Sequence, residues 1–428
     1  MKLSVNLTVS MFLFSLAIQT LAQPTIPREQ IPPDSMQKVV AEIKRLYSSD
    51  PMERGQAASS LGSMGDTAQA AIPYLMAMFH NDSVGLAYPN PFGGMPDWSD
   101  CPAKRAALAL AHVGGAAVDT LLSLYNTGDE HEKLWSVYAL AQIREARTTI
   151  ALKQFLESSY QFYEPHYGWM GYYEEKPPIF KISYSMVLRE VIEELGERRD
   201  TSAVYLLINI ACDTASSLRE ESVQALGKIG DRRAVEPLIH LLDQNSLSGY
   251  AALALALIND PRAVKPLLSH LKDATGNYNC SVMGALGDFK STEALNAIIP
   301  ALQSPNISDR LAAADAIGAN GSWPTVNRSI KERRPIAAGR TVAVEPLIDA
   351  LQDTCPEVRH AVMRALGSIG DTRAIMPLYN VMKRQPAPDS WWAQDALIDI
   401  TGEDFRQYDG GHDKWIQWQR KWIPGFPD

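Results

Sequence analysis

Histidine side chains and possible nucleophiles are the residues of this chain that could do chemistry, but their spacing assembles no site. His240 and His270 lie about 30 residues apart, three residues after Pro237 and four after Pro266, so they do not occupy equivalent positions. A zinc site needs several ligands that converge on one point. The chain has no G-x-S-x-G, C-x-x-C or H-E-x-x-H motif and no phosphate-binding glycine loop. We therefore predict no catalytic residues, no metal ligands and no cofactor.

Side chains suited to binding a partner gather instead in three stretches, at 82–101, 159–182 and 323–341. Aromatic rings at an exposed edge give a large contact area for a small loss of side-chain entropy. A basic stretch suits an acidic partner or an anionic polymer, although a solvated loop is the default explanation. The candidates are Tyr88, Phe92 and Trp98 in the first stretch, Tyr163, Tyr167, Trp169, Tyr172 and Tyr173 in the second, and Arg328, Arg333, Arg334 and Arg340 in the third.

These stretches interrupt a pattern that predicts pairs of helices. In LREESVQALGKIGDRRAVEPLIHLLDQNS (218–246), apolar residues follow one helical face until Gly230, which ends the helix, and Asp231 can cap the next one. The small residues Ala225 and Gly227 would let a neighbouring helix approach closely. Each pair has more apolar surface than it can bury alone, so the pairs must stack.

The pattern recurs ten times. Aligned on Leu226, near the end of the second helix of each pair, the equivalent residues repeat with a period near 30 that is interrupted three times. Such a period predicts an all-α, right-handed solenoid of about ten helix pairs over residues 34–402. The aligned residues are Leu61, Leu110, Leu140, Leu195, Leu226, Leu255, Leu286, Ile317, Leu366 and Leu397.

The segments ALGKIGDRRAVEPLIHLL (225–242) and ALGSIGDTRAIMPLYNVM (365–382) resemble HEAT repeats, specifically the short PBS-lyase HEAT-like form. The resemblance implies the same stacked helices. Its name points to bilin lyases, which attach or remove tetrapyrroles, but those act inside the cell. HEAT-repeat hydroxylases hold a di-iron centre with several His-Glu dipeptides, whereas this chain has only His131-Glu132.

Two polar positions recur near the turns and predict structural ladders. Arginines lie seven residues before the aligned position and aspartates five residues after it, so we interpret both as caps and inter-repeat pairs. A ligand-binding charge row is the alternative. The ladder residues are Arg54, Arg219, Arg310 and Arg359, with Asp66, Asp231, Asp260 and Asp371.

The two ends of the chain differ from the repeats. Residues 1–22 combine Lys2, a short apolar run and Thr20-Leu21-Ala22, which predicts a secretory signal peptide cleaved before Gln23. A Pro-rich lead-in follows at 23–33. At the other end, tryptophans at Trp415, Trp418 and Trp422 share one helical face, so residues 403–428 are predicted to cap the last repeat; carbohydrate stacking is the alternative.

The net charge and the positions of the cysteines argue against some classes of function and some kinds of structure. The formal net charge of −9 argues against nucleic acid as a partner, and no apolar stretch after the signal is long enough to span a membrane. Four cysteines fall in non-adjacent repeats, too far apart for disulfides, so we predict free buried thiols.

Together these features predict an exported, periplasmic or extracellular scaffold without catalysis. It would bind another protein through the concave face lined by the second helices and through the aromatic stretches. The alternatives are an extracellular glycan-binding module and a bilin-lyase-like, tetrapyrrole-handling protein. The oligomeric state stays open.

Overall fold

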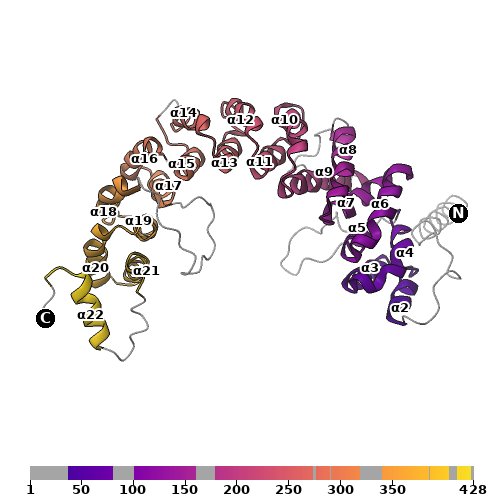
Figure 1. The fold of residues 1–428 in the computed structure, drawn as a ribbon, viewed down its shortest axis with the longest axis horizontal. Helices are drawn as coiled ribbons and strands as arrows, with labels where there is room; N and C mark the ends of the chain where they lie inside the picture. The colour runs from indigo at the N-terminus through magenta and orange to yellow at the C-terminus, as the bar shows by residue number, and fades with distance from the viewer. Residues whose placement is uncertain are drawn as a thin grey trace, which may run out of the picture. The chain divides into compact units, whose positions relative to one another are not determined.

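The computed structural model describes residues 37–80, 101–160, 179–272, 276–289, 291–318, 340–384, 386–403 and 412–425 (Figure 1). These ranges form two compact units, Met1–Ala225 (unit 1) and Leu226–Asp428 (unit 2), and the division falls inside helix α11, Arg219–Ile229. The predicted signal peptide and lead-in lie outside the described residues.

Unit 1 is built from antiparallel helix pairs. In each pair a first helix precedes a second helix, and successive second helices α3, α5, α7 and α9 pack against one another. The pairs are α2 (Gln37–Arg45) with α3 (Pro51–Ser63), α4 (Ile72–Met76) with α5 (Pro102–Val113), α6 (Gly115–Thr127) with α7 (Glu130–Gln142), and α8 (Ala146–Ser159) with α9 (Ile179–Glu197), followed by α10 (Val204–Cys212). Helix α9 begins inside the stretch that the sequence predicted as the second insertion.

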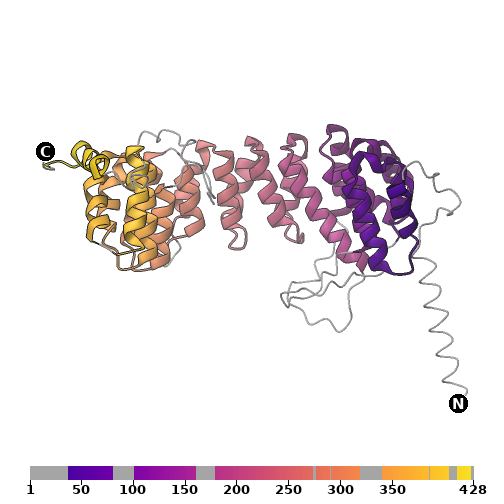
Figure 2. The same ribbon diagram turned by 90° about the horizontal axis from the view of Figure 1, so that it is seen from below.

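Unit 2 continues the same pattern. Its first helices are α12 (Val235–Leu241), α14 (Val264–Ser269), α16 (Thr292–Ile298), α18 (Val344–Ala350) and α20 (Ile375–Arg384). Its second helices are α13 (Ser248–Ile258), α15 (Cys280–Asp288), α17 (Ile307–Gly318), α19 (Pro356–Ile369) and α21 (Asp389–Thr401). Figure 1 shows the two kinds as separate rows in this unit, and Figure 2 shows its helix pairs as successive layers. The predicted all-α solenoid of stacked helix pairs is confirmed.

The motif Ala-Leu-Gly explains how closely the second helices pack. The glycine after the aligned residue faces the alanine before the aligned residue of the next second helix. A Cβ atom on Gly227 would lie 2.8 Å from Cα of Ala254, and one on Gly287 would lie 2.4 Å from the carbonyl oxygen of Ala316. The other such pairs are Gly62 with Ala109, Gly318 with Ala365, and Gly367 with Ala396. The close approach predicted at Gly227 is therefore confirmed.

The aspartate ladder caps the first helices of unit 2. Three aspartates each accept a hydrogen bond from the backbone N–H two residues later, and each forms an ion pair with the arginine at that position. They are Asp231, Asp260 and Asp371. In the last two cases this arginine also reaches back one repeat, because Arg262 contacts Glu236 at 3.2 Å and Arg373 contacts Glu345 at 3.3 Å. Asp66 differs: Met64 is the N-cap residue there and caps without its side chain.

The arginine ladder is a separate row. All four arginines donate to backbone carbonyl groups at the turn before their own helix, as Arg54 does to Ser48 at 2.9 Å and Arg219 does to Ala211 at 2.9 Å. Arg310 and Arg359 also pair with Asp353 and Asp389 of the next repeat. These are the kinds of contact that the capping and inter-repeat interpretation predicts.

One residue of the third stretch, Arg340, was predicted to belong to a basic loop but is not exposed. Its side chain is buried, and its guanidinium group donates to the carbonyl oxygens of Ile317 at 2.5 Å and Gly287 at 2.7 Å. It therefore satisfies the C-terminal carbonyl groups of two second helices and is not available to a partner.

Helix α22 (His412–Trp422) is the last helix of the described residues. Trp418 is buried with its ring 6.5 Å from that of Tyr379, and its indole N–H donates to Thr401 at 3.4 Å. Gln419 donates to the Tyr379 hydroxyl at 2.7 Å. The terminal repeat thus loses an exposed apolar face.

The four cysteines are free, which confirms that part of the prediction. The prediction that they are buried holds for Cys101, but it is wrong for Cys212 and Cys280, which are exposed, and Cys355 is half-buried. Cys280 is the first residue of α15, and its thiol lies 3.9 Å from the carbonyl oxygen of Ser308 at the start of α17.

Candidate binding surface

Each second helix of unit 2 presents one row of exposed or half-buried positions, six and two residues before the aligned residue and two after it. We call this row in unit 2 the second-helix face. Equivalent positions on neighbouring helices lie side by side, because Arg364 on α19 pairs with Asp315 on α17 at 2.5 Å. The face comprises Lys228, Gly249, Leu253, Leu257, Cys280, Gly284, Asp288, Leu311, Asp315, His360, Arg364, Ser368, Trp391, Asp395 and Asp399.

The part of the face over α13 is apolar. Leu253 is 39% exposed and Leu257 is 64% exposed, whereas most other residues of α13 are buried. On the neighbouring helix, a Cβ atom at Gly284 would meet no other described atom within 4 Å. The Cδ1 atom of Leu257 lies toward the preceding helix, 3.2 Å from where a Cβ atom on Gly227 of α11 would be, so the two exposed leucines form a small apolar patch over α13. Adjacent exposed apolar side chains are a mark of interaction sites.

Two acidic residues of the face lie on the neighbouring helices α15 and α17. Asp288 lies one turn after Gly284, and its Oδ1 atom is buried without a hydrogen-bond donor among the described residues. Burial raises the pKa of Asp288, while the nearby positive charge of Arg340 opposes that rise. Asp315 lies on α17 and its side chain is only 13% exposed. Asp315 is paired with Arg364 of α19, and the Asp288 side chain is half-buried.

The face ends in an aromatic cluster at the start of α21. Trp391 is 64% exposed, and the Trp392 ring stacks on His360 with 5.4 Å between the ring centroids. Asp389 lies beneath them and accepts from Arg359 at 2.7 Å and from His360 at 2.8 Å. Burial raises the pKa of Asp389, but these two hydrogen bonds outweigh it and hold the pKa below its usual value.

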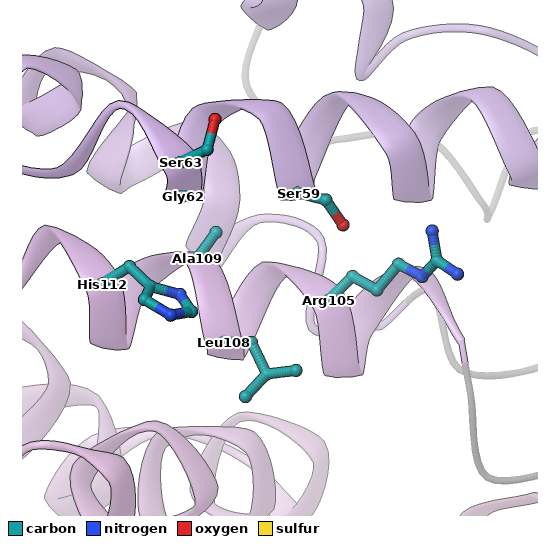
Figure 3. Close-up of a pocket in the computed structure, with 7 residues that line it drawn as sticks. All are labelled: Ser59, Gly62, Ser63, Arg105, Leu108, Ala109 and His112. Atoms are coloured by element: carbon teal, nitrogen blue, oxygen red, sulfur yellow. The ribbon is translucent and has the colours of Figure 1, made fainter. Parts of the chain in front are cut away.

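Unit 1 has a shallow hollow on its corresponding face, between α3 and α5. Figure 3 shows Ser59 and Ser63 on one helix, with Arg105, Leu108 and His112 on the other. The hollow also includes Gly62 and Ala109 and has a volume of about 230 Å³. Clefts that enclose drug-sized ligands measure roughly 300–1,000 Å³. This hollow is therefore suited to a side chain of a partner more than to an enclosed ligand.

The residues that the sequence singled out for binding lie outside the described ranges, apart from Arg340. They are Tyr88, Phe92, Trp98, Tyr163, Tyr167, Trp169, Tyr172, Tyr173, Arg328, Arg333 and Arg334. The structure leaves their roles as predictions.

Two histidines that the sequence raised as possible metal ligands, His270 and His131, have other contacts. His270 contacts Asp243 through Nε2 at 3.0 Å, and its Nδ1 lies 2.8 Å from the Pro266 carbonyl oxygen. His131 stacks on His80 with 5.5 Å between ring centroids. Over the described ranges no three His, Cys, Asp or Glu side chains converge as metal ligands would.

Sequence reasoning missed the second-helix face. Helix α13 has the sequence SGYAALALALI, which is apolar all round and conceals which leucines are exposed. The alignment on Leu255 could have revealed the two exposed leucines, because the positions two residues before and two residues after the aligned residue are polar in most other second helices.

Comparisons with known proteins agree with this architecture. The chain matches the family of HEAT repeats over 183–249 and 328–398, and the PBS lyase HEAT-like repeat over 53–81 and 249–273. It is a HEAT-repeat protein.

Individual relatives are similar over limited parts. The bilin biosynthesis protein PecE of Mastigocladus laminosus is 44% identical over 66 residues, which are 15% of this chain and 24% of that protein, so the chain spans about a quarter of the relative's length. An engineered protein has a TM-score of 0.39 at 20% identity, covering 85% of this chain and 99% of its own. The complex of CpcE and CpcF of a phycocyanin lyase from Nostoc has a TM-score of 0.28 at 18% identity, covering 66% of this chain and 94% of that chain.

Proposed function

We propose that this protein is a non-catalytic, exported scaffold that binds another protein through its second-helix faces and aromatic insertions. The observation that carries the proposal is the exposure of Leu253, Leu257 and Trp391 on one repeated face of unit 2. Large apolar side chains exposed in a row are unfavourable in water unless a partner covers them. A stack of repeats presents such a row over many layers at once.

Site-specific photocrosslinking tests which face meets a partner. A photoreactive phenylalanine analogue would replace Leu253, Trp391 or Leu108 on second helices, and Tyr205 or Asp349 on first helices as controls. In the native host we expect protein adducts from the second-helix positions and none from the controls. Equal crosslinking from both kinds of helix would contradict a role for this face.

The aromatic insertions are tested separately by deletion. Removing residues 161–178 leaves the described helices α8 and α9 intact, so the helical circular dichroism signal should persist while the crosslinked adduct disappears. An undiminished adduct would remove the second insertion from the binding surface.

Export rests on the signal-like residues 1–22. The described helices include none with the length and apolar character needed to cross a bilayer. N-terminal sequencing of the protein from the native host is the direct test. A mature chain that begins at Gln23 is expected, and a chain that retains its first 22 residues in the cytosol would overturn export.

Handling of a tetrapyrrole is the second candidate, favoured by the similarity to PecE over 66 residues. It predicts that biliverdin added to the purified protein gives a saturable, red-shifted absorption band. The scaffold proposal predicts no such band. A band lost on changing the hollow between α3 and α5, for example with Ser59→Trp, would place the pigment there and favour this candidate.

A further inference from the structure

The hollow between α3 and α5 in unit 1 is lined by basic and hydroxyl-bearing side chains. Arg105 and His112 lie seven residues apart on α5, which is about two turns or roughly 10 Å along the helix axis. Leu108 lies between them, and Ser59 and Ser63 face them from α3 (Figure 3). Among the described residues that line the hollow, none carries a carboxyl group. The hollow is therefore locally positive, in a chain whose formal net charge is −9.

The two helices that form the hollow bring little negative charge of their own. Helix α5 contains no acidic residue. Helix α3 contains one, Glu53, and its carboxylate is already paired with Arg45 at 3.4 Å. A concave surface lined by one sign of charge attracts groups of the opposite sign. Charge complementarity therefore favours an anionic occupant.

The serines and the leucine suit the shape of an acidic side chain. The Ser59 hydroxyl donates to the Gly55 carbonyl oxygen at 3.1 Å, and the Ser63 hydroxyl donates to the Ser60 carbonyl oxygen at 2.7 Å. Both serines are exposed, and a hydroxyl hydrogen rotates to the acceptor that suits it, so either hydroxyl can turn to a carboxylate. Leu108 offers an apolar surface to the methylene groups of the same side chain.

Other classes of side chain match the hollow less well. A lysine or arginine would be repelled by Arg105, and a purely apolar side chain would gain nothing from its charge. Arg105 also interacts with another residue, but a guanidinium group has five N–H donors, so a carboxylate can be added to that interaction. We propose that the hollow receives a glutamate or aspartate side chain from an acidic segment of a partner protein. This deepens the scaffold function proposed above and rests on it.

The experiment uses a phage-displayed library of random dodecapeptides, selected on the full-length protein with counter-selection on Ser59→Trp, which fills the hollow from α3. Enriched peptides are resynthesised with a fluorescein label, and their affinities are measured by fluorescence anisotropy. We expect an acidic residue next to apolar residues. Replacing that acid by its amide, or using Arg105→Gln protein, should each lower the affinity about tenfold, and His112→Gln should lower it about threefold. The affinity should also fall as the salt concentration rises, because salt screens partly exposed charges.

An exchange of charges tests the pairing directly. Arg105→Glu should bind a peptide in which lysine replaces the acid more tightly than it binds the original peptide, and the wild type should show the reverse preference. Lys44→Gln is the matched control, because it removes one positive charge from an exposed position on the first helix α2 of the same unit. It should leave the affinity unchanged, and circular dichroism should show that the variants are folded. The peptide-side replacements use wild-type protein, so they decide the question even if a variant is unstable.

Several results would overturn the proposal. Enriched peptides that lack an acid, or that bind Arg105→Gln as tightly as they bind Lys44→Gln, would show that charge does not select the occupant. A selection that yields no peptide able to distinguish the wild type from Ser59→Trp would remove the hollow from the binding surface. Displacement of the peptides by biliverdin would assign the hollow to the pigment. Photocrosslinking at Leu253 and Trp391 in unit 2 tests the scaffold function without this hollow, so the two proposals can fail separately.

Discussion

Helix α15 carries two glycines whose replacement by alanine should have opposite effects on the free energy of unfolding. At Gly287 a new Cβ atom would lie 2.4 Å from the carbonyl oxygen, 2.8 Å from the carbonyl carbon and 2.9 Å from Cα of Ala316. These are backbone atoms of α17, which cannot rotate away. At Gly284, one turn earlier, the new methyl group would meet no other described atom within 4 Å.

The magnitudes follow from two competing effects. Alanine in a helix interior is more favourable than glycine by about 0.5–1 kcal/mol. Overpacking a close helix contact costs about 1–3 kcal/mol, because α15 and α17 must separate. Gly284→Ala should therefore raise the free energy of unfolding by about 0.5–1 kcal/mol, while Gly287→Ala should lower it by about 1–2 kcal/mol.

Urea unfolding followed by circular dichroism at 222 nm measures both variants, with hydrogen exchange of α15 and α17 as a local readout because repeat arrays need not unfold in one step. The two changes are chemically identical and lie on one helix, so each controls for the other. Equal shifts of the same sign would refute the assignment of Gly287 to the helix contact. A stable Gly287→Ala protein would show that the layers are looser than the structure has them.

Three further predictions follow from the capping and buried charges. Asp260→Ala should lower the free energy of unfolding by about 1 kcal/mol through loss of the N-cap, whereas Asp66→Ala should change it by less than about 0.5 kcal/mol, as urea unfolding would show. Arg340→Met should lower it by at least about 2 kcal/mol, because two carbonyl groups lose a charged donor; wild-type urea midpoints would contradict this. Burial raises the pKa of Asp288, so its contribution is greatest below the usual carboxyl pKa of about 4 and is lost as pH rises through the raised value. Asp288→Asn should therefore raise the melting temperature at pH 7 and have little effect near pH 3; a uniform effect across that range would contradict the pKa shift.

Most of the fold could be predicted from the repeat period. Leu226 and its equivalents marked the second helices, and the alanine and glycine on either side of Leu226 correctly indicated a close contact that the structure places at Ala254. Where the sequence of one repeat is ambiguous, the other repeats at the same spacing of about 30 residues support the assignment of its helices. Single residues lack that support: Asp66 occupies the ladder position but does not cap, because the turn before it ends one helix and begins the 3-10 helix at once.

The candidate site could not be predicted in the same way. Arg340 is one of several arginines in a basic stretch, and only its backbone position shows that it is buried against Gly287 and Ile317. Leu253 and Leu257 belong to a helix with apolar residues on every side, so their exposure depends on which neighbours the stack supplies. Whether such a leucine is exposed depends on its own repeat and on the two neighbouring repeats. The sequence therefore indicates the exposure only after the repeats have been aligned.

The alignment also distinguishes a glycine that the fold needs from one that it does not. Gly287 permits the approach of α17, and its counterparts Gly62, Gly227, Gly318 and Gly367 do the same on four other second helices. Gly284 has no such contact, yet it lowers the stability of a short helix. Asp288, four residues later, adds a second cost through its buried oxygen without a donor among the described residues. Gly284 and Asp288 lie two residues before and two residues after the aligned residue Leu286 of α15. A glycine that a helix contact requires and a glycine that it does not require look the same in the sequence, so only the backbone that the neighbouring helix supplies separates Gly287 from Gly284.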